Sequence, residues 1–108
     1  MKTTQTVLDV GDDMVIMKTT RRAAGAGTWA TGTIAGHHFE GLVFPEHAEC
    51  QDFELGASRI SKLWLQELYD EKTVVNFDRG WDVRPRTKIA AAIVDFLVAN
   101  LAERIYNT

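Results

Sequence analysis

The segment that decides the fold spans residues 28–44 and reads Thr28-Trp29-Ala30-Thr31-Gly32-Thr33-Ile34-Ala35-Gly36-His37-His38-Phe39-Glu40-Gly41-Leu42-Val43-Phe44. Two runs rich in β-branched and aromatic residues, 28–35 and 38–44, are typical of strands. Gly36 and His37 lie between them and suit a type II′ turn, whose first central position needs a positive φ. The segment therefore predicts an antiparallel β-hairpin.

Residues before and after this hairpin predict further strands. Residues 14–18 form a short first strand, and the Gly- and Ala-rich link of residues 21–27 is the expected flexible segment. After the hairpin, Pro45 ends the strand and residues 45–58 form a loop.

Residues 60–68 fit two patterns. Ile60, Leu63, Trp64 and Leu68 share one helical face, whereas Leu63 and Leu65 lie opposite Ile60, Lys62 and Trp64 on a strand. We favour a strand, because the polar residues 69–72 resemble a turn into the β-prone run 73–77. A second antiparallel hairpin would then complete the sheet.

The C-terminal residues predict one long helix. Pro85 closes the last strand, and Thr87 can cap a helix from about residue 88 to residue 106. Its apolar positions cover more than half of the circumference, whereas one sheet face requires a stripe of only ~100°. They are Ile89, Ile93, Val94, Phe96, Leu97, Val98, Leu101 and Ile105. The second apolar neighbour is either another chain, or the loop 45–58 or the N-terminal arm.

These elements together predict an α+β fold, in which one C-terminal helix, residues 87–106, packs across a four- or five-stranded antiparallel sheet. A chain of 108 residues suits a single domain, 1–108, with residues 1–13 as a flexible arm. No stretch is long enough to cross a bilayer, and Asp9, Asp12 and Asp13 interrupt the start, so no signal peptide is expected. The single cysteine, Cys50, fits a reducing compartment. We expect a soluble cytoplasmic protein.

The net charge of −3 is concentrated in the middle of the chain. No Lys or Arg occurs between Arg22 and Arg59, a segment with five acidic residues: Glu40, Glu46, Glu49, Asp52 and Glu54. Such a segment repels nucleic acid and attracts a basic protein surface. We therefore expect a protein partner rather than nucleic acid. A solvated acidic loop is the alternative interpretation.

Residues 76–82, Asn-Phe-Asp-Arg-Gly-Trp-Asp, combine aromatic and charged side chains. On one strand, Phe77, Arg79 and Trp81 would share a face opposite Asp78 and Asp82. Arg79 could be structural, stacked on Trp81 or Trp29 with a bulge at Gly80, or it could belong to a contact surface. The predicted partner-binding residues are Glu46, Glu49, Asp52, Glu54, Asp78, Arg79, Trp81 and Asp82.

The residues that could support chemistry are few. His37, His38, His47 and Cys50 offer zinc's preferred ligand types, but adjacent histidines on a strand point to opposite faces. A small metal- or ligand-binding protein is therefore an alternative hypothesis, and no cofactor is predicted. No nucleophile elbow or phosphate loop is present. Asp78 and Asp82 would lie roughly 13 Å apart on a strand, too far for an acid–base pair. We predict no catalytic residue.

Three blocks of the sequence resemble a small domain of unknown function from bacteriophages and mobile elements. They are Trp29-x-x-Gly32-Thr33-Ile34-x-Gly36-x-x-Phe39, Ser58-Arg59-Ile60-Ser61-Lys62-Leu63 and Asn76-Phe77-Asp78-Arg79-Gly80-Trp81-Asp82. The resemblance implies a β-hairpin domain without a known activity. Small acidic phage proteins often bind and block a host protein, as anti-CRISPR inhibitors do. The resemblance therefore favours a non-enzymatic protein-binding module. We expect it to be a homodimer. A structural phage component is a further alternative.

Overall fold

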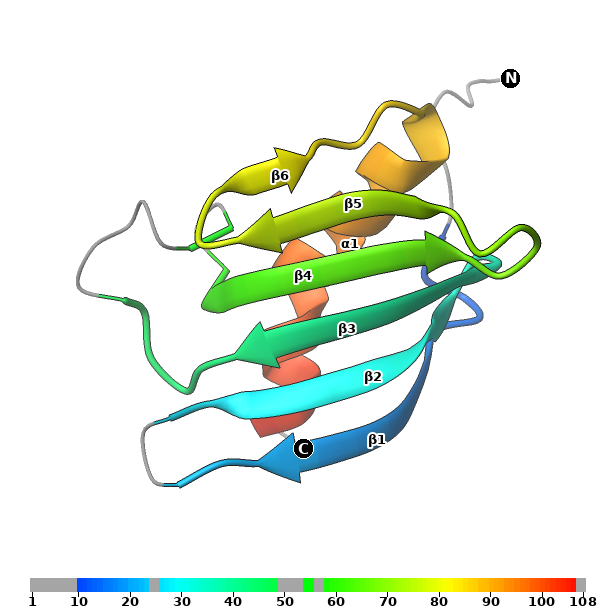
Figure 1. The fold of residues 1–108 in the computed structure, drawn as a ribbon. Coiled ribbons are helices and arrows are strands. Elements are labelled where there is room, and N and C mark those ends of the chain that lie inside the picture. The colour runs from blue at the N-terminus through cyan, green and yellow to red at the C-terminus, as the bar shows by residue number, and fades with distance from the viewer. Residues whose placement is uncertain (1–9, 24–25, 49–53, 56–57, 107–108) are drawn as a thin grey trace, which may run out of the picture.

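The computed structural model describes residues 10–23, 26–48, 54–55 and 58–106, which form an α+β fold with one six-stranded antiparallel sheet and one helix (Figure 1). The elements are β1 (Val15–Arg21), β2 (Thr28–Ile34), β3 (His37–Val43), β4 (Ile60–Glu67), β5 (Thr73–Asp78), β6 (Trp81–Val83) and α1 (Lys88–Tyr106). The strands lie in the sheet in the same order as in the chain. The sheet is therefore a meander, in which every strand pairs with its neighbours in sequence.

The β2–β3 hairpin is confirmed, but its turn is not the predicted one. Ile34 pairs with His37, so the turn residues are Ala35 and Gly36, with φ angles of 48° and 77°. Two positive φ values define a type I′ turn rather than the expected type II′. The observed register places Ile34 and Phe39 on the same face, and both are fully buried. A one-residue shift would expose one of them, so core packing selects this turn.

The prediction of four or five strands was wrong, because the run after residue 73 folds back on itself. Arg79 and Gly80 have positive φ values of 54° and 157°, and the Asp78 N–H donates to the Gly80 carbonyl at 2.8 Å. Residues 76–82 are therefore a hairpin rather than one strand. Phe77 pairs with Trp81, and their rings meet edge to face at 5.2 Å. This turn creates β6 as the sixth strand.

Residues 60–67 form strand β4, as the alternating pattern favoured. Leu63 and Leu65 are buried on the helix side, and Trp64 lies on the opposite side. β4 pairs with β3 on one side and with β5 on the other. Because β4 is a central strand, it carries apolar side chains on both of its faces, and such a sequence also fits the pattern of a helix.

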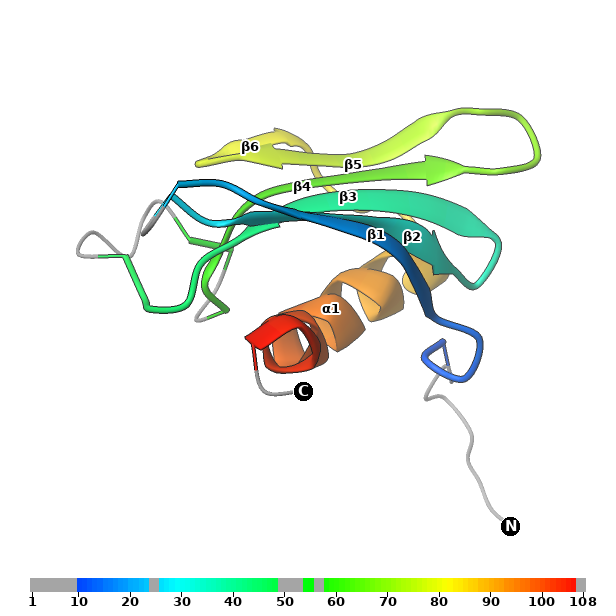
Figure 2. The same ribbon diagram turned by 90° about the horizontal axis from the view of Figure 1, so that it is seen from below.

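Helix α1 begins where the sequence indicated. Thr87 caps it, since its Oγ1 accepts a hydrogen bond of 3.1 Å from the Ala90 N–H. Figure 2 shows the helix lying across one face of the sheet. Its buried residues are Ala90, Ile93, Val94, Leu97, Leu101, Ala102 and Ile105.

The extra apolar surface of the helix is covered by the chain itself. Val10 and Leu55 belong to the same hydrophobic core as the helix. Gly11 lies so close to Phe96 that an added Cβ would be 2.1 Å from the ring. Of the predicted arm, residues 10–13 pack on the domain and residues 1–9 lie outside the described part. The helix therefore does not need a second chain to bury this surface.

The other face of the sheet is not covered by any element within the described ranges (Figure 2). We call it the open face, and define it by Trp29, His38, Glu40, Leu42, Lys62, Trp64, Asn76 and Asp78, which the strand register places together. Among the described residues, no helix is long and apolar enough to cross a membrane.

Candidate functional site

A pocket of about 570 Å³ lies at one end of the open face. The β3–β4 connection forms one wall, with Pro45 to Ala48 and Glu54, and Leu42 and Phe44 supply apolar surface. Four cationic side chains line it: Arg22, Arg59, Lys62 and Arg79. We call it the basic pocket. Its residues come from the end of β1, from β3, from β4 and from the β5–β6 turn, so only the folded sheet assembles it.

The cations of the basic pocket are only partly neutralised. Lys62 Nζ lies 3.6 Å and Arg79 Nε 3.9 Å from the same Asp78 carboxylate oxygen, which is beyond hydrogen-bond distance. Arg59 donates one guanidinium N–H to the Pro45 carbonyl at 2.7 Å. Each of these side chains therefore keeps N–H groups that a ligand could use.

Two of these arginines have an uncommon backbone conformation. Arg59 and Arg79 have φ angles of 65° and 54°, in the left-handed region that non-glycine residues seldom adopt. Main-chain hydrogen bonds hold both positions: Phe44 N–H donates to the Arg59 carbonyl and Arg79 N–H to the Ser61 carbonyl, each at 2.9 Å. The surrounding sheet thus fixes where both side chains leave the backbone.

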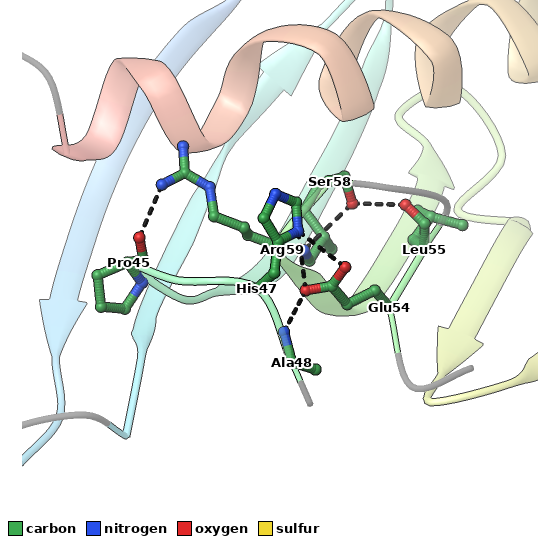
Figure 3. Close-up of polar contacts among 8 residues, drawn as sticks. Pro45, His47, Ala48, Glu54, Leu55, Ser58 and Arg59 are labelled. Carbon is green, nitrogen blue, oxygen red and sulfur yellow. Dashed lines mark hydrogen bonds and ion pairs between the residues drawn. The ribbon is translucent and has the colours of Figure 1, made fainter. Parts of the chain in front are cut away.

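The wall of the basic pocket is held by a buried carboxylate (Figure 3). The Glu54 side chain is 2% exposed and accepts hydrogen bonds from His47 Nδ1 at 3.0 Å and from the Ala48 N–H. Nearby, Ser58 Oγ donates to the Leu55 carbonyl and accepts from the Ile60 N–H at 3.1 Å. These bonds join the two ends of the β3–β4 connection to each other and to the start of β4.

The open face continues from the pocket as a shallow, partly aromatic surface. Trp29 and Trp64 are half-buried there, together with Glu40 and Lys62 in one depression. Trp64 Nε1 donates to Thr73 Oγ1 at 3.1 Å, and the His38 ring meets the Trp64 ring edge to face at 5.5 Å. The indole is therefore held in place rather than free to turn.

The predicted partner-binding residues are only partly brought together. Glu46 and Arg79 line the basic pocket, and Asp78 lies beside it. Glu54 is buried, so its carboxylate serves the loop and does not face a partner. Glu49 and Asp52 lie outside the described residues.

Trp81 and Asp82 lie on edge strand β6 and do not line the basic pocket. Trp81 packs against Phe77, and the Arg84 guanidinium lies 5.4 Å from its ring centre. The predicted stacking of Arg79 on Trp81 or Trp29 is therefore replaced by a contact with Arg84. Asp82 is exposed.

Sequence reasoning missed Arg22, Arg59 and Lys62. The gap in basic residues between Arg22 and Arg59 was visible, but it was interpreted only as an acidic segment. The antiparallel return of β2 and β3 brings the two ends of that gap together, and the pairing of Leu42 with Lys62 adds the third cation. No local motif carries this information.

The three histidines are separated in the structure. His37 Nδ1 donates to the Ala35 carbonyl at 2.9 Å inside the hairpin, His38 lies against Trp64, and His47 bonds to Glu54. In the part of the chain that the structure describes, no three His, Cys, Asp or Glu residues are grouped as metal ligands. Cys50, the fourth predicted ligand, lies outside that part.

A family model described as a domain of unknown function, DUF7678, matches residues 28–102. The chain belongs to the DUF7678 family. The match runs from β2 into α1 and includes Arg59, Lys62 and Arg79, whereas Arg22 precedes it. No curated protein and no solved structure matches the chain. The family assignment confirms a domain of unknown function, and it carries no activity.

Proposed function

We propose that this DUF7678 protein is a non-enzymatic protein-binding module that contacts its partner with the open face and the basic pocket. The observation that carries the proposal is that an uncovered sheet face, with Trp29 and the hydrogen-bonded Trp64, ends in a pocket lined by arginines. Trp and Arg are the residue types that contribute most to protein interfaces. Half-buried Trp29 and Trp64 would gain further burial on docking, which favours association.

The polar contacts around the pocket favour binding over catalysis. His47 is oriented by Glu54 in the way that a general base is oriented by a carboxylate. However, the hydroxyl of nearby Ser58 donates to the Leu55 carbonyl instead of to a histidine. The Glu54 carboxylate also bonds to the Ala48 N–H, so the pair fits a loop anchor.

The resemblance to phage and mobile-element domains extends this proposal. A small acidic domain of that origin would act by occupying a surface of a host protein, in the manner of an anti-CRISPR inhibitor. Its site of action would be the host cytoplasm. This part rests on sequence resemblance alone, and a partner from the defence machinery of the native host would support it.

Co-purification of a tagged chain from its native host, followed by mass spectrometry, tests the proposal. We expect one stoichiometric partner with the wild type and with the control Tyr69→Ala, which removes an almost fully exposed ring in the β4–β5 turn. Recovery should fall at least tenfold with Trp64→Ala. Thr31→Lys provides a second test, because Thr31 pairs with Glu40 and a lysine there adds bulk without entering the core. Full recovery with both folded variants would contradict the proposal.

Edge strand β1 favours self-association as a second property. Val15 and Met17 on this strand are 53% and 68% exposed. An uncapped edge with exposed apolar side chains can pair with the edge of another copy. We propose a homodimer through β1, which light scattering coupled to gel filtration would detect. Met17→Lys should shift it to monomer, and an unchanged dimer mass would place the interface elsewhere.

A further inference from the structure

We propose that the basic pocket binds an acidic peptide segment of the partner, with at least two carboxylate side chains. This inference rests on the proposed function and adds the chemistry that the partner must present. The lining combines Arg22, Arg59, Lys62 and Arg79 with Glu46 and Glu54. Those formal charges sum to +2, or to +1 with Asp78, whose carboxylate lies beside Lys62 and Arg79, in a chain whose net charge is −3. The pocket is therefore a local exception to the overall charge, which is the pattern expected for electrostatic recognition.

The two acids of the lining do not cancel the four cations equally. Glu54 is nearly inaccessible and is already bonded to His47 and Ala48. Glu46, at the exposed start of the loop, makes no ion pair with a described residue. Arg22 likewise has no hydrogen-bond or ion-pair partner for its guanidinium within the described segments. The arginines thus present forked donors that match carboxylate geometry.

The size of the pocket favours a peptide over a compact anion. A volume of about 570 Å³ is far larger than one phosphate or sulfate ion requires. The four cations come from three places in the fold, the end of β1, the start of β4 and the β5–β6 turn, so they suit separate carboxylates along a chain. Leu42 and Phe44 add an apolar wall for the methylene groups of such residues.

The surroundings of the pocket argue against nucleic acid. A nucleic-acid site needs cations distributed along the path of the phosphate backbone. Beyond the pocket, the open face instead carries the carboxylates of Glu40 and Asp78 beside Lys62. A phosphate backbone that crossed this face would pass the Glu40 carboxylate, whereas an acidic peptide that ended in the pocket would not reach Glu40.

The backbone of the pocket is arranged before any ligand binds. Arg59 and Arg79 are left-handed residues, and a main-chain hydrogen bond to a neighbouring segment holds each of them in place. Ordering these positions would therefore take less free energy than ordering arginines on a flexible loop.

Fluorescence anisotropy with a labelled tetraglutamate peptide tests the inference. We expect binding at low ionic strength that weakens as salt is raised. Arg22→Gln combined with Arg79→Gln should weaken it at least tenfold, and both residues are exposed, so the fold should survive. Arg86→Gln is the matched control, because Arg86 is an exposed arginine that does not line the pocket. A tetraglutamine peptide should not bind.

Three results would overturn the inference. They are equal affinity for tetraglutamate in the double variant, equal affinity for a thymidine oligonucleotide, and displacement of the peptide by equimolar inorganic phosphate. Co-purification with the double variant separates this inference from the proposed function. If the partner is retained while the peptide fails to bind, the acidic-peptide inference fails and the binding module stands. If the peptide binds and no partner is recovered, the proposed function fails.

Discussion

Tyr106→Phe should destabilise the domain through a single hydroxyl at the end of α1. The Tyr106 hydroxyl donates to the Val43 carbonyl at 2.8 Å and accepts from Thr28 Oγ1 at 2.9 Å. These contacts join the end of the helix to β2 and β3, beside the strand ends that form the basic pocket. Removing one oxygen atom breaks both contacts and leaves the ring in place.

The size of the effect follows from burial. Thr28 is 1% exposed, so its hydroxyl would lose its recorded partner in a place that water cannot easily reach. The lost bond to Val43 is worth about 1 kcal/mol, and the unsatisfied Thr28 hydroxyl costs at least about 1 kcal/mol more. We expect a loss of roughly 2–3 kcal/mol in the free energy of unfolding. For 108 residues, this corresponds to a fall in Tm of about 9–13 °C.

Urea denaturation followed by circular dichroism measures this loss, and Thr28→Val is the matched control. The valine has nearly the same shape as threonine and no hydroxyl, so it removes the orphaned group that Tyr106→Phe creates. The double variant should therefore be more stable than Tyr106→Phe alone, since replacing both partners by apolar groups can be nearly neutral. A loss below about 0.5 kcal/mol in Tyr106→Phe, the range of ordinary surface changes, would refute the reasoning. Additive losses in the double variant would refute it too.

Three further predictions use the same denaturation assay. Gly32→Ala should destabilise the domain much more than Gly36→Ala. An added Cβ at Gly32 would lie 2.0 Å from the Val15 carbonyl oxygen, whereas a Cβ at Gly36 would meet open space and only the φ of 77° would disfavour it. Similar losses of unfolding free energy in the two variants would contradict this close β1–β2 contact. Glu54→Gln should lower the free energy of unfolding by about 1.5–3 kcal/mol, since a charged acceptor of two hydrogen bonds is lost. His47→Ala should lower it less, because the His47 side chain is 59% exposed. A larger loss in His47→Ala than in Glu54→Gln would mean that the histidine anchors the loop. Thr87→Ala should lower the free energy of unfolding by about 1 kcal/mol, because the α1 cap is lost. Thr87→Ser keeps a capping hydroxyl and should retain most of this stability. Equal stability of the two variants would exclude a capping role.

The parts of the fold that the sequence predicted are those that local chemistry determines. The β2–β3 hairpin follows from its β-prone runs, and the start of α1 follows from Pro85 and Thr87. The alternation of Leu63 and Leu65 with Trp64 was enough to favour a strand for β4, although only tertiary pairing decides between two apolar patterns.

The β5–β6 turn was not predictable in the same way. It depends on a left-handed Arg79, and arginine carries no preference for that conformation. Gly80 was visible, but one glycine in a strand pattern also fits a bulge. The Arg79 N–H to Ser61 carbonyl bond stabilises the turn across strands, and no reading of residues 76–82 alone reveals it.

The candidate site was predicted only where it coincides with a conspicuous local pattern. Of the predicted partner-binding residues, Glu46 and Arg79 line the basic pocket, and the sequence singles them out because charged residues gather around them. Glu54 was expected to face a partner, yet its carboxylate is turned inward by the His47 and Ala48 donors. Whether a loop carboxylate faces solvent depends on which hydrogen-bond donors the folded loop places near it. The tertiary structure determines this arrangement, and the local sequence does not.

The meander topology explains why an acidic chain contains a basic pocket. Strand β2 runs away from the pocket and the antiparallel strand β3 runs back toward it. Arg22 before this hairpin and Arg59 after it therefore lie at the same end of the sheet. The residues between them, which contain no cation, supply the strands and the loop wall instead. Lys62 joins from the start of β4, and Arg79 joins from the β5–β6 turn, at the same end of the sheet. The fold therefore gathers cations from both sides of the acidic segment at one end of the sheet, where Glu46 and Glu54 of that segment also line the pocket, while Glu40 lies on the open face. A partner that presents carboxylates to the pocket and an apolar surface to Trp29 and Trp64 would match both parts of this surface at once.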